Sequence, residues 1–268
     1  MGGPFAAGDF WAALPVTLLA VAVLMLATFA VAATTGRQVV VDVVWGFGFV
    51  VVAVTALAVA HASARGWLAA ALTAAWGLRL AVHIGLRSRG AGEDPRYEEL
   101  MAKATGNKHL YALRKVFLTQ GVVMWFVSLP VQVAMFETGA PGPVAWLGVV
   151  VWAVGLFFEG VGDWQLTRFR NDPASRGKVL DSGLWRYTRH PNYFGDACVW
   201  WGLWLLAADA GLPGLLTVLS PVLMTWFLAR GTGKPLLEKG MAERRPGYAD
   251  YVARTSGFFP RPPRRRVT

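Results

Sequence analysis

Apolar residues occur along this chain in long runs that polar residues interrupt only at intervals. Five runs reach the roughly 20 residues that a helix needs to cross a bilayer. They lie near residues 11–33, 43–60, 67–86, 116–136 and 144–166. Two shorter runs follow near 193–208 and 213–229. The pattern predicts an all-α integral membrane protein with seven transmembrane helices in a single domain over residues 1–268.

Residue types exclude several kinds of protein and site. Only 16% of the residues are charged, against about 25% in a typical soluble domain. The single Cys198 excludes an internal disulfide framework. The four His residues lack the HxxxH and HExxH spacings, so no metal site is expected. No Lys or Arg precedes Arg37, so the first apolar run is expected to be a retained helix rather than a signal peptide.

The positive charges predict how the helices are oriented. If the N-terminus lies outside, all Lys and Arg residues except Arg65 and Arg79 fall on the cytoplasmic side or beside it, as the positive-inside rule requires. The C-terminus is then cytoplasmic, and the protein is expected to be a multi-pass protein of a bacterial-type inner cell membrane. The net charge of +10 needs no nucleic acid as partner. The basic tail at 261–266 is expected to touch anionic lipid headgroups instead.

Ionisable residues within the apolar runs are candidates for chemistry, because such residues are costly in a membrane. Asp42 opens the second run, and Arg79 and His83 are four residues apart on the third, so they share a helix face. Glu159 and Asp163 have the same spacing on the fifth run. Two carboxylates so placed repel each other and need cationic or hydroxyl partners. His83 also has a structural interpretation, as a ring that simply bonds a neighbouring helix.

The densest polar cluster is GLWRYTRHPNYFGD at 183–196, which runs directly into an apolar stretch. Further along, Tyr248 and Tyr251 are three residues apart and lie among arginines. Hydroxyl, aromatic and guanidinium groups suit a ligand that carries phosphates and an aromatic ring. An interfacial aromatic belt is the alternative role for the two tyrosines. Neither a GxGxxG segment after a strand nor a Walker loop is present, so a nucleotide would bind without a Rossmann domain.

Five segments carry a resemblance to the bacterial relatives of the steroid 5-alpha-reductases. They are VDVVWGFGF at 41–49, AAWGLRLAVHIGLRSRGAGEDPRY at 74–97, EGVGDWQLTRFR at 159–170, SGLWRYTRHPNYFGDACVWWG at 182–202, and ARGTGKPLLEK with GYADYVARTSGFFP within 229–260. The fourth segment is also similar to the sterol C14 and delta-7 reductases, which carry RHPNY followed by Gly-Asp. More loosely, it is similar to the isoprenylcysteine carboxyl methyltransferases.

The resemblance implies a seven-helix membrane reductase that binds NADPH. Residues 137–268 would form the NADPH-binding helices and loops, and residues 1–136 the substrate side. The residues that the resemblance and the polar clusters assign to the cofactor are Glu159, Asp163, Arg168, Arg170, Trp185, Tyr187, Arg189, His190, Asn192, Tyr193, Asp196, Arg230, Lys234, Tyr248 and Tyr251. Those assigned to catalysis are Asp42, Arg79, His83 and Tyr193.

The implied reaction is hydride transfer to an activated C=C bond of a steroid or another lipid or isoprenoid substrate. Negative charge then develops on the conjugated carbonyl oxygen, and a donor in a dry cavity stabilises it. In the steroid enzymes a Glu and a Tyr hold the ketone. Asp42, Arg79 and His83 are the nearest candidates in this chain, and no tyrosine aligns with the second of those groups.

Two other functions remain open on the sequence. An S-adenosylmethionine-dependent lipid or isoprenylcysteine-type methyltransferase would use the same RHPNY segment. Such enzymes tend to have fewer spans and a Glu-Glu pair before their last tyrosines, where this chain has Glu238 followed by Lys239. The third possibility is a lipid-binding membrane protein that keeps the fold without catalysis.

Overall fold

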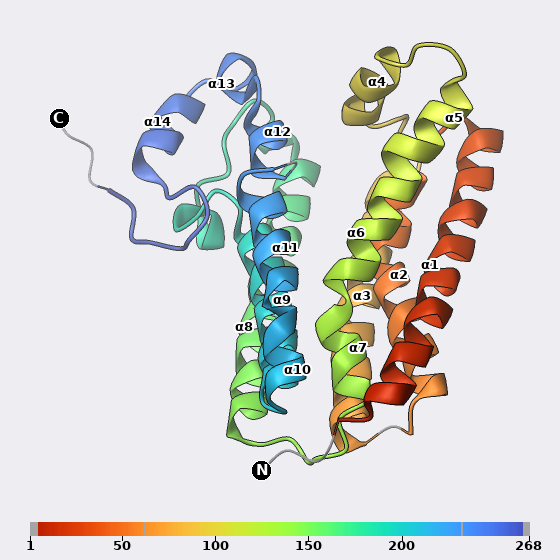
Figure 1. Ribbon diagram of the computed structural model, residues 1–268. Helices are drawn as coiled ribbons and strands as arrows, with labels where there is room; N and C mark the ends of the chain where they lie inside the picture. The colour runs from red at the N-terminus through yellow and green to blue at the C-terminus, as the bar shows by residue number, and fades with distance from the viewer. Residues whose placement is uncertain (1–4, 62, 232, 265–268) are drawn as a thin grey trace. The chain divides into compact units, whose positions relative to one another are not determined.

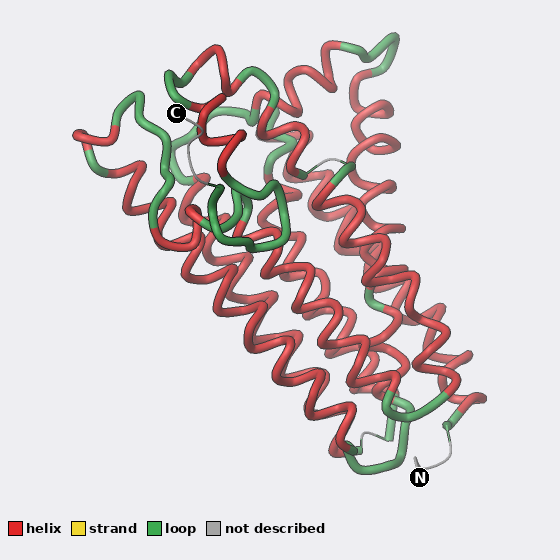
Figure 2. Tube along the Cα trace, turned by 90° about the vertical axis from the view of Figure 1, so that its left-hand side faces the viewer, coloured by secondary structure: helices red, strands yellow, loops and turns green. Residues whose placement is uncertain are grey.

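The computed structural model describes residues 5–264 except 62 and 232, and its regular structure is helical throughout that part of the chain (Figures 1 and 2). The basic tail is therefore described only as far as Arg264, and Arg265 and Arg266 lie outside the described residues. The α-helices are α1 Ala7–Thr35, α2 Val40–Val59, α3 Ala64–Ser88, α4 Pro95–Ala102, α5 Lys108–Ala112, α6 Thr119–Val127, α7 Leu129–Met135, α8 Pro143–Asn171, α9 Pro191–Ala208, α10 Leu212–Leu215, α11 Leu219–Ala229, α12 Lys234–Glu238, α13 Met241–Arg244 and α14 Tyr248–Arg254. A π-helix, η1, covers Leu113–Leu118, and short 3-10 turns are η2 Pro173–Ser175, η3 Gly183–Arg186 and η4 Leu216–Val218.

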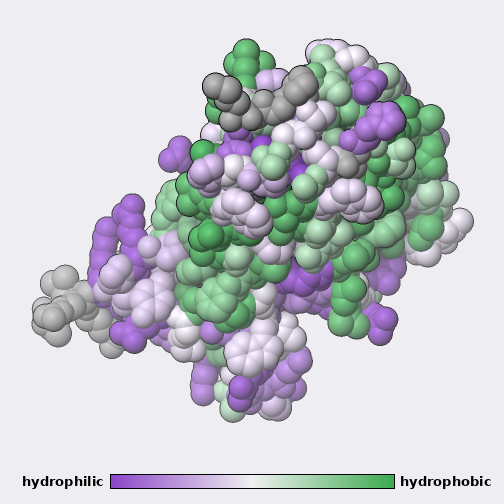
Figure 3. Space-filling view, turned by 90° about the horizontal axis from the view of Figure 1, so that it is seen from below, coloured by the Kyte–Doolittle hydropathy of each residue, from purple (hydrophilic) through white to green (hydrophobic). Residues whose placement is uncertain are grey.

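Six helical segments among the described residues are long and apolar enough to cross a membrane. They are Ala7–Thr35, Val40–Val59, Ala64–Ser88, Lys108–Val127, Pro143–Asn171 and Leu212–Arg244. They confirm the prediction of a multi-pass helical membrane protein, and the broad apolar areas of its surface are visible in Figure 3. The predicted span at 193–208 forms α9 but is not among the six, since its first turns carry Asn192 and Asp196. The count of seven spans and the orientation of the termini stay predictions.

The chain divides into two compact units. The first contains Met1–Gly148 and Leu203–Ser220, and the second contains Val149–Gly202 and Pro221–Thr268. Leu203–Ser220 thus belongs to the first unit, although it lies in the half of the sequence assigned to the cofactor.

In the first unit, α1 packs against α2 and α6, and α3 packs against α2 and α7 (Figure 1). Glycines allow the close approach of α2 and α3. A Cβ atom on Gly46 would lie 2.5 Å from the carbonyl oxygen of Gly77, and one on Gly77 would lie 2.5 Å from the carbonyl oxygen of Gly46. Any larger residue at either position would therefore push the two helices apart.

The fourth predicted span, 116–136, is not one regular helix. Its helical segment begins earlier, at Lys108, passes through the π-helix η1 and breaks at Ser128 before α7. Pro130 is the physical reason for the break, because its ring excludes the carbonyl of residue 126 from the helical ladder. The freed carbonyl oxygen of Phe126 accepts a hydrogen bond from Ser220 Oγ at 3.0 Å.

Arg65, the exception to the charge asymmetry, is neutralised inside the first unit. Its side chain is 1% exposed and its guanidinium lies 2.9 Å from an Asp209 carboxylate oxygen. The same guanidinium donates to the carbonyl oxygens of Leu206 and Ala140 at 2.8 and 2.9 Å. Arg65 is therefore a paired structural residue at the start of α3 rather than a loop charge that would set the orientation.

In the second unit, α8 and α9 meet at two glycines. A Cβ atom on Gly155 would lie 2.6 Å from both the carbonyl oxygen of Gly195 and the backbone nitrogen of Val199. A Cβ atom on Gly195 would lie 2.4 Å from the backbone nitrogen of Glu159. This contact brings the polar face of α8 directly beside the start of α9.

Replacing Gly155 by alanine is expected to lower the stability of the protein by about 1–3 kcal/mol, because the new methyl group meets backbone atoms that cannot move aside. Gly160 on the same helix is the matched control, since nothing lies within 4 Å of a Cβ added there. Gly160→Ala should be neutral or stabilising by up to about 1 kcal/mol. Thermal unfolding in detergent measures both variants, and equal melting temperatures would contradict the close α8–α9 contact.

Candidate functional site

The polar segment 183–190 forms a strap across one end of the second unit, and α8 holds one side of it. The Trp185 indole donates to the carbonyl oxygen of Gly162 at 3.1 Å. The Leu184 backbone N–H donates to the Gln165 side chain at 3.0 Å. Gly183 opens the strap with φ +58°, a backbone conformation that favours glycine. Trp185 is buried by these contacts, so it anchors the strap rather than offering its ring to a ligand.

The C-terminal segment holds the other side of the strap. The Tyr251 hydroxyl donates to the carbonyl oxygen of Trp185 at 2.6 Å. The Arg189 backbone N–H donates to Ser256, and the Thr188 hydroxyl donates to Phe258, both at backbone carbonyl oxygens. Tyr248 and Tyr251 both lie on α14, and their ring centroids are 5.9 Å apart. Both are buried, so Tyr251 uses its hydroxyl within the protein.

A buried charge cluster joins the strap to α12. Arg189 Nε donates to Glu238 Oε1 at 2.8 Å, and His190 Nε2 lies 2.9 Å from the same oxygen. Arg189 Nη1 donates to the carbonyl oxygen of Thr255 at 2.6 Å. Arg189 and His190 are 8% and 5% exposed. Both predicted cofactor residues are therefore buried and bonded to Glu238, and they hold the strap to α12.

Burial lowers the pKa of His190 below its usual value, and the hydrogen bond to Glu238 offsets this only in part. Folding therefore favours the neutral ring over the protonated one, relative to the unfolded chain. Below a pH of about 6.5 the unfolded chain binds a proton that the folded protein does not. The free energy of unfolding should therefore fall as the pH falls through this range, by at most about 1.4 kcal/mol per pH unit from this group.

His190→Gln removes the titration and keeps a donor toward Glu238. The variant is expected to lose less stability than the wild type between about pH 7 and pH 5. His109→Gln, at an exposed position, is the control and should follow the wild type. Melting temperatures measured across this pH range decide the matter, and identical pH profiles for His190→Gln and the wild type would refute the assignment.

The start of α9 meets the acidic face of α8. Asn192 Nδ2 donates to Asp163 Oδ1 at 3.1 Å, and Asn192 Oδ1 accepts from the Tyr193 backbone N–H. The Tyr193 ring stacks on His190, with 5.5 Å between the ring centroids. Glu159 is 3% and Asp163 6% exposed, so both carboxylates of the predicted pair are buried. Asp196, 8% exposed, follows one turn after Asn192 on the same helix.

The remaining predicted cofactor residues of the second unit have accessible side chains. Tyr187 is 44% exposed. Lys234 is half-buried, and its ammonium lies beside Gly257 together with the Arg189 guanidinium. The exposed arginines among the predicted residues are Arg168, Arg170 and Arg230. Guanidinium groups at the surface of the same unit as the strap are thus the groups that an approaching anion would meet first.

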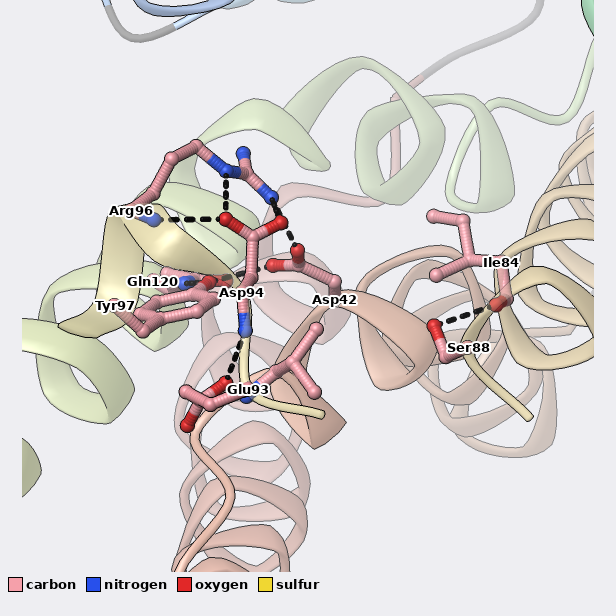
Figure 4. Close-up of polar contacts among 9 residues, drawn as sticks. Asp42, Ile84, Ser88, Glu93, Asp94, Arg96, Tyr97 and Gln120 are labelled. Atoms are coloured by element: carbon pink, nitrogen blue, oxygen red, sulfur yellow. Dashed lines mark hydrogen bonds and ion pairs between the residues drawn. The ribbon is translucent and has the colours of Figure 1, made fainter. Parts of the chain in front are cut away.

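The first unit contains the other catalytic candidates. Asp42 lies in the first turn of α2, as predicted, and the turn at 93–97 places Asp94, Arg96 and Tyr97 beside it (Figure 4). Its carboxylate accepts hydrogen bonds from Arg96 at 2.8 Å and from the Tyr97 hydroxyl at 2.5 Å (Figure 4). Gln120 donates to the same hydroxyl at 3.1 Å. Burial and the Asp42 carboxylate raise the pKa of Tyr97, so the phenol stays protonated.

Arg79 and His83 lie four residues apart on α3. Because this segment is helical, the two residues lie on one helix face, as predicted. Both side chains are half-buried. Together with Asp42 they belong to the first unit, whereas Tyr193 belongs to the second.

Sequence reasoning missed two residues that the structure connects to the predicted ones. Glu238 was considered only as half of an absent Glu-Glu pair, yet it binds both Arg189 and His190. Tyr97 was not singled out as a site residue, yet its hydroxyl donates to Asp42. The EDPRY sequence at 93–97 could have predicted the start of a helix, because Asp94 caps α4 and Pro95 is its first residue. Nothing in that signal indicated that the turn would fold back onto α2.

Comparisons with known proteins give a family but no activity. The uncharacterized protein C594.04c of Schizosaccharomyces pombe is 26% identical over 229 residues, which is 75% of this chain and 64% of that protein. The chain thus spans less than two thirds of the length of this curated relative. No solved structure matches. A family model described as a protein of unknown function, DUF1295, matches residues 28–255, and the chain belongs to this family.

Proposed function

We propose that this protein is a membrane-embedded reductase that uses NADPH to reduce an activated C=C bond in a steroid or another lipid or isoprenoid. The observation that carries the proposal is the meeting of three segments in one unit. The acidic face of α8, the strap with the start of α9, and the segment from α12 to α14 are joined by the Asp163–Asn192, Glu238–Arg189 and Tyr251–Trp185 hydrogen bonds. These are the segments that resemble the cofactor-binding parts of the steroid 5-alpha-reductases.

The residues of this unit fit the chemistry of a dinucleotide. Exposed Arg168, Arg170 and Arg230 offer forked donors that suit phosphate oxygens. Asp163 with Asn192 offers an acceptor and a donor of the kind that binds ribose hydroxyls. Tyr187 offers an accessible ring for stacking. Arginines in excess of the diphosphate charge favour NADPH over NADH, because its 2′-phosphate needs a cation.

The bound nicotinamide would supply the hydride. The chain itself must bind the lipid, exclude water, and place a hydrogen-bond donor at the oxygen on which charge develops. Arg79 and His83 on α3, and Tyr193 on α9, carry donors suited to that task. Asp42 takes a different part in this proposal. Its oxygens are bonded by Arg96 and Tyr97, so it holds the 93–97 turn over the helix end and positions the site.

The same proposal includes the finer topology. The N-terminus lies outside, α9 crosses the membrane as a seventh span, and the strap faces the cytoplasm, where a soluble dinucleotide is available. The asymmetry of Lys and Arg supports this orientation.

Turnover with a mixed lipid extract tests the proposed activity. Purified protein in nanodiscs is incubated with NADPH and the extract, NADPH oxidation is followed by absorbance, and lipids are compared by mass spectrometry. The expected result is oxidation that depends on the extract and a lipid product heavier by H2. Methylated lipids formed with S-adenosylmethionine, and no NADPH oxidation, would contradict the proposal.

A further inference from the structure

A cavity lies in the first unit, lined by the end of α1, the residues just before α2 and the helices α4 and α5. Its volume is about 380 Å³. Its apolar lining includes Phe29 and Ala33 of α1 and Met101 of α4. Its polar lining includes Gln38 and the charged residues Glu93, Glu98 and Lys108. The cavity is thus amphipathic, with an apolar wall and a charged rim.

The position of the cavity along the helices matches the level of lipid headgroups. The first candidate membrane span, α1, ends at Thr35, and the fourth candidate span begins at Lys108. The cavity is lined by residues from both of these ends. One to two turns before Phe29 on α1, Val23 and Leu26 are 58% and 52% exposed. A ligand held in the cavity could therefore extend an apolar chain along α1.

Two of the charged residues that line the cavity, Glu98 and Lys108, form no ion pair with another side chain among residues 5–264 with the two stated gaps. Gln38 Oε1 is buried and accepts no hydrogen bond from any described residue. Glu93 differs, because its carboxylate accepts the backbone N–H groups of Gln38 and Val39. The cavity therefore offers an open carboxylate, an open ammonium and a buried acceptor.

These groups select a zwitterion that carries a primary amine. The last turn of α1 contains no basic residue, so its carbonyl groups add partial negative charge near Glu98 and Gln38. A primary ammonium has three N–H donors to place there, whereas a choline headgroup has none. Lys108 supplies the positive charge for a phosphate.

We infer that this cavity binds one phospholipid with a primary-amine headgroup, of the phosphatidylethanolamine type. The ammonium binds Glu98 and Gln38, the phosphate binds Lys108, and an acyl chain follows Phe29 and Ala33 down α1. This lipid is a resident of the first unit and not the substrate of the proposed reductase, so the inference does not depend on that activity.

Native mass spectrometry of the delipidated full-length protein in detergent tests the site. Phosphatidylethanolamine, phosphatidylcholine and phosphatidylglycerol are added separately, and the bound fraction is titrated. The wild type is expected to bind phosphatidylethanolamine about tenfold more tightly than the other two, as one charge-assisted contact allows. Equal affinity for the three lipids would overturn the inference.

Matched variants locate the binding. Glu98→Gln should abolish the preference for phosphatidylethanolamine, and Lys108→Gln should weaken all three lipids alike. Glu99→Gln and Lys103→Gln are the controls, because these residues form an exposed pair on the neighbouring surface. Ala33→Phe fills the apolar wall without changing a charge and should weaken phosphatidylethanolamine too. Unchanged binding in Glu98→Gln and Ala33→Phe, with wild-type melting temperatures, would place the lipid elsewhere and overturn the inference.

A soluble competitor separates a lipid from a free headgroup. Glycerophosphoethanolamine lacks acyl chains and is expected to compete at least about a hundredfold more weakly, because it buries no chain against α1. Competition at the same concentration as the lipid would show a site for a water-soluble amine phosphate and would refute the lipid assignment.

Discussion

Replacement of Glu238 by alanine is expected to lower the free energy of unfolding by about 3 kcal/mol, the low end of the range for breaking a buried ion pair. Arg189 is almost fully buried and would keep its charge beside the carbonyl oxygens of Val252 and Thr255, without a carboxylate. His190 would lose its carboxylate partner at the same time. The Glu238 side chain is 20% exposed, so water can partly replace it, which keeps the effect from being larger. Thermal and denaturant unfolding in detergent measure the loss.

Two further variants make that result specific. Glu243→Ala removes an exposed carboxylate from the neighbouring helix α13 and should leave stability within about 0.5 kcal/mol of the wild type. Glu238→Gln keeps an acceptor without the charge, so its free energy of unfolding should lie between those of Glu238→Ala and Glu243→Ala. If Glu238→Ala unfolds like Glu243→Ala, the cluster does not hold the strap to α12.

Replacement of Arg170 by alanine is expected to weaken NADPH binding about tenfold to a hundredfold, the value of a hydrogen bond to a charged group. Arg170 is exposed near the end of α8, seven residues after the buried Asp163, so both lie on one helix face. Melting temperature should stay near that of the wild type, because an exposed arginine adds little stability. Binding is measured as the shift in melting temperature against NADPH concentration.

Arg176→Ala is the control for the loss of one positive charge. It lies beyond α8, at an exposed position after the turn η2, and should bind NADPH like the wild type. Equal weakening in both variants would indicate a diffuse effect of net charge. If neither variant binds NADPH more weakly than the wild type, the end of α8 does not contribute to the cofactor site.

The sequence predicted the helical architecture because a long apolar run in a membrane has few alternatives to a helix. The break at Pro130 was missed because the run around it is apolar on both sides. The run predicted near 193–208 is helical and forms α9, Pro191–Ala208, although its polar first turns keep it out of the six apolar spans. Local propensity and hydropathy are therefore enough for the elements, but not for their ends.

The candidate site was predictable in its members but not in their contacts. Arg189, His190 and Tyr251 were predicted to bind a ligand. In the structure, their side chains form hydrogen bonds with Glu238, Thr255 and Trp185 instead. Whether a side chain faces a ligand or a neighbouring segment depends on tertiary packing between residues about 50 to 65 positions apart. Spacing along one helix, as for Tyr248 and Tyr251, contains no information about that packing.

Cofactor affinity of the wild-type protein tests the central proposal most directly. Purified protein in nanodiscs is titrated with NADPH and, separately, with S-adenosylmethionine, and heat of binding and melting temperature are recorded. A reductase is expected to bind NADPH with a dissociation constant in the micromolar range or below, with a matching stabilisation, and not to bind S-adenosylmethionine. Saturable binding of S-adenosylmethionine without binding of NADPH would contradict it.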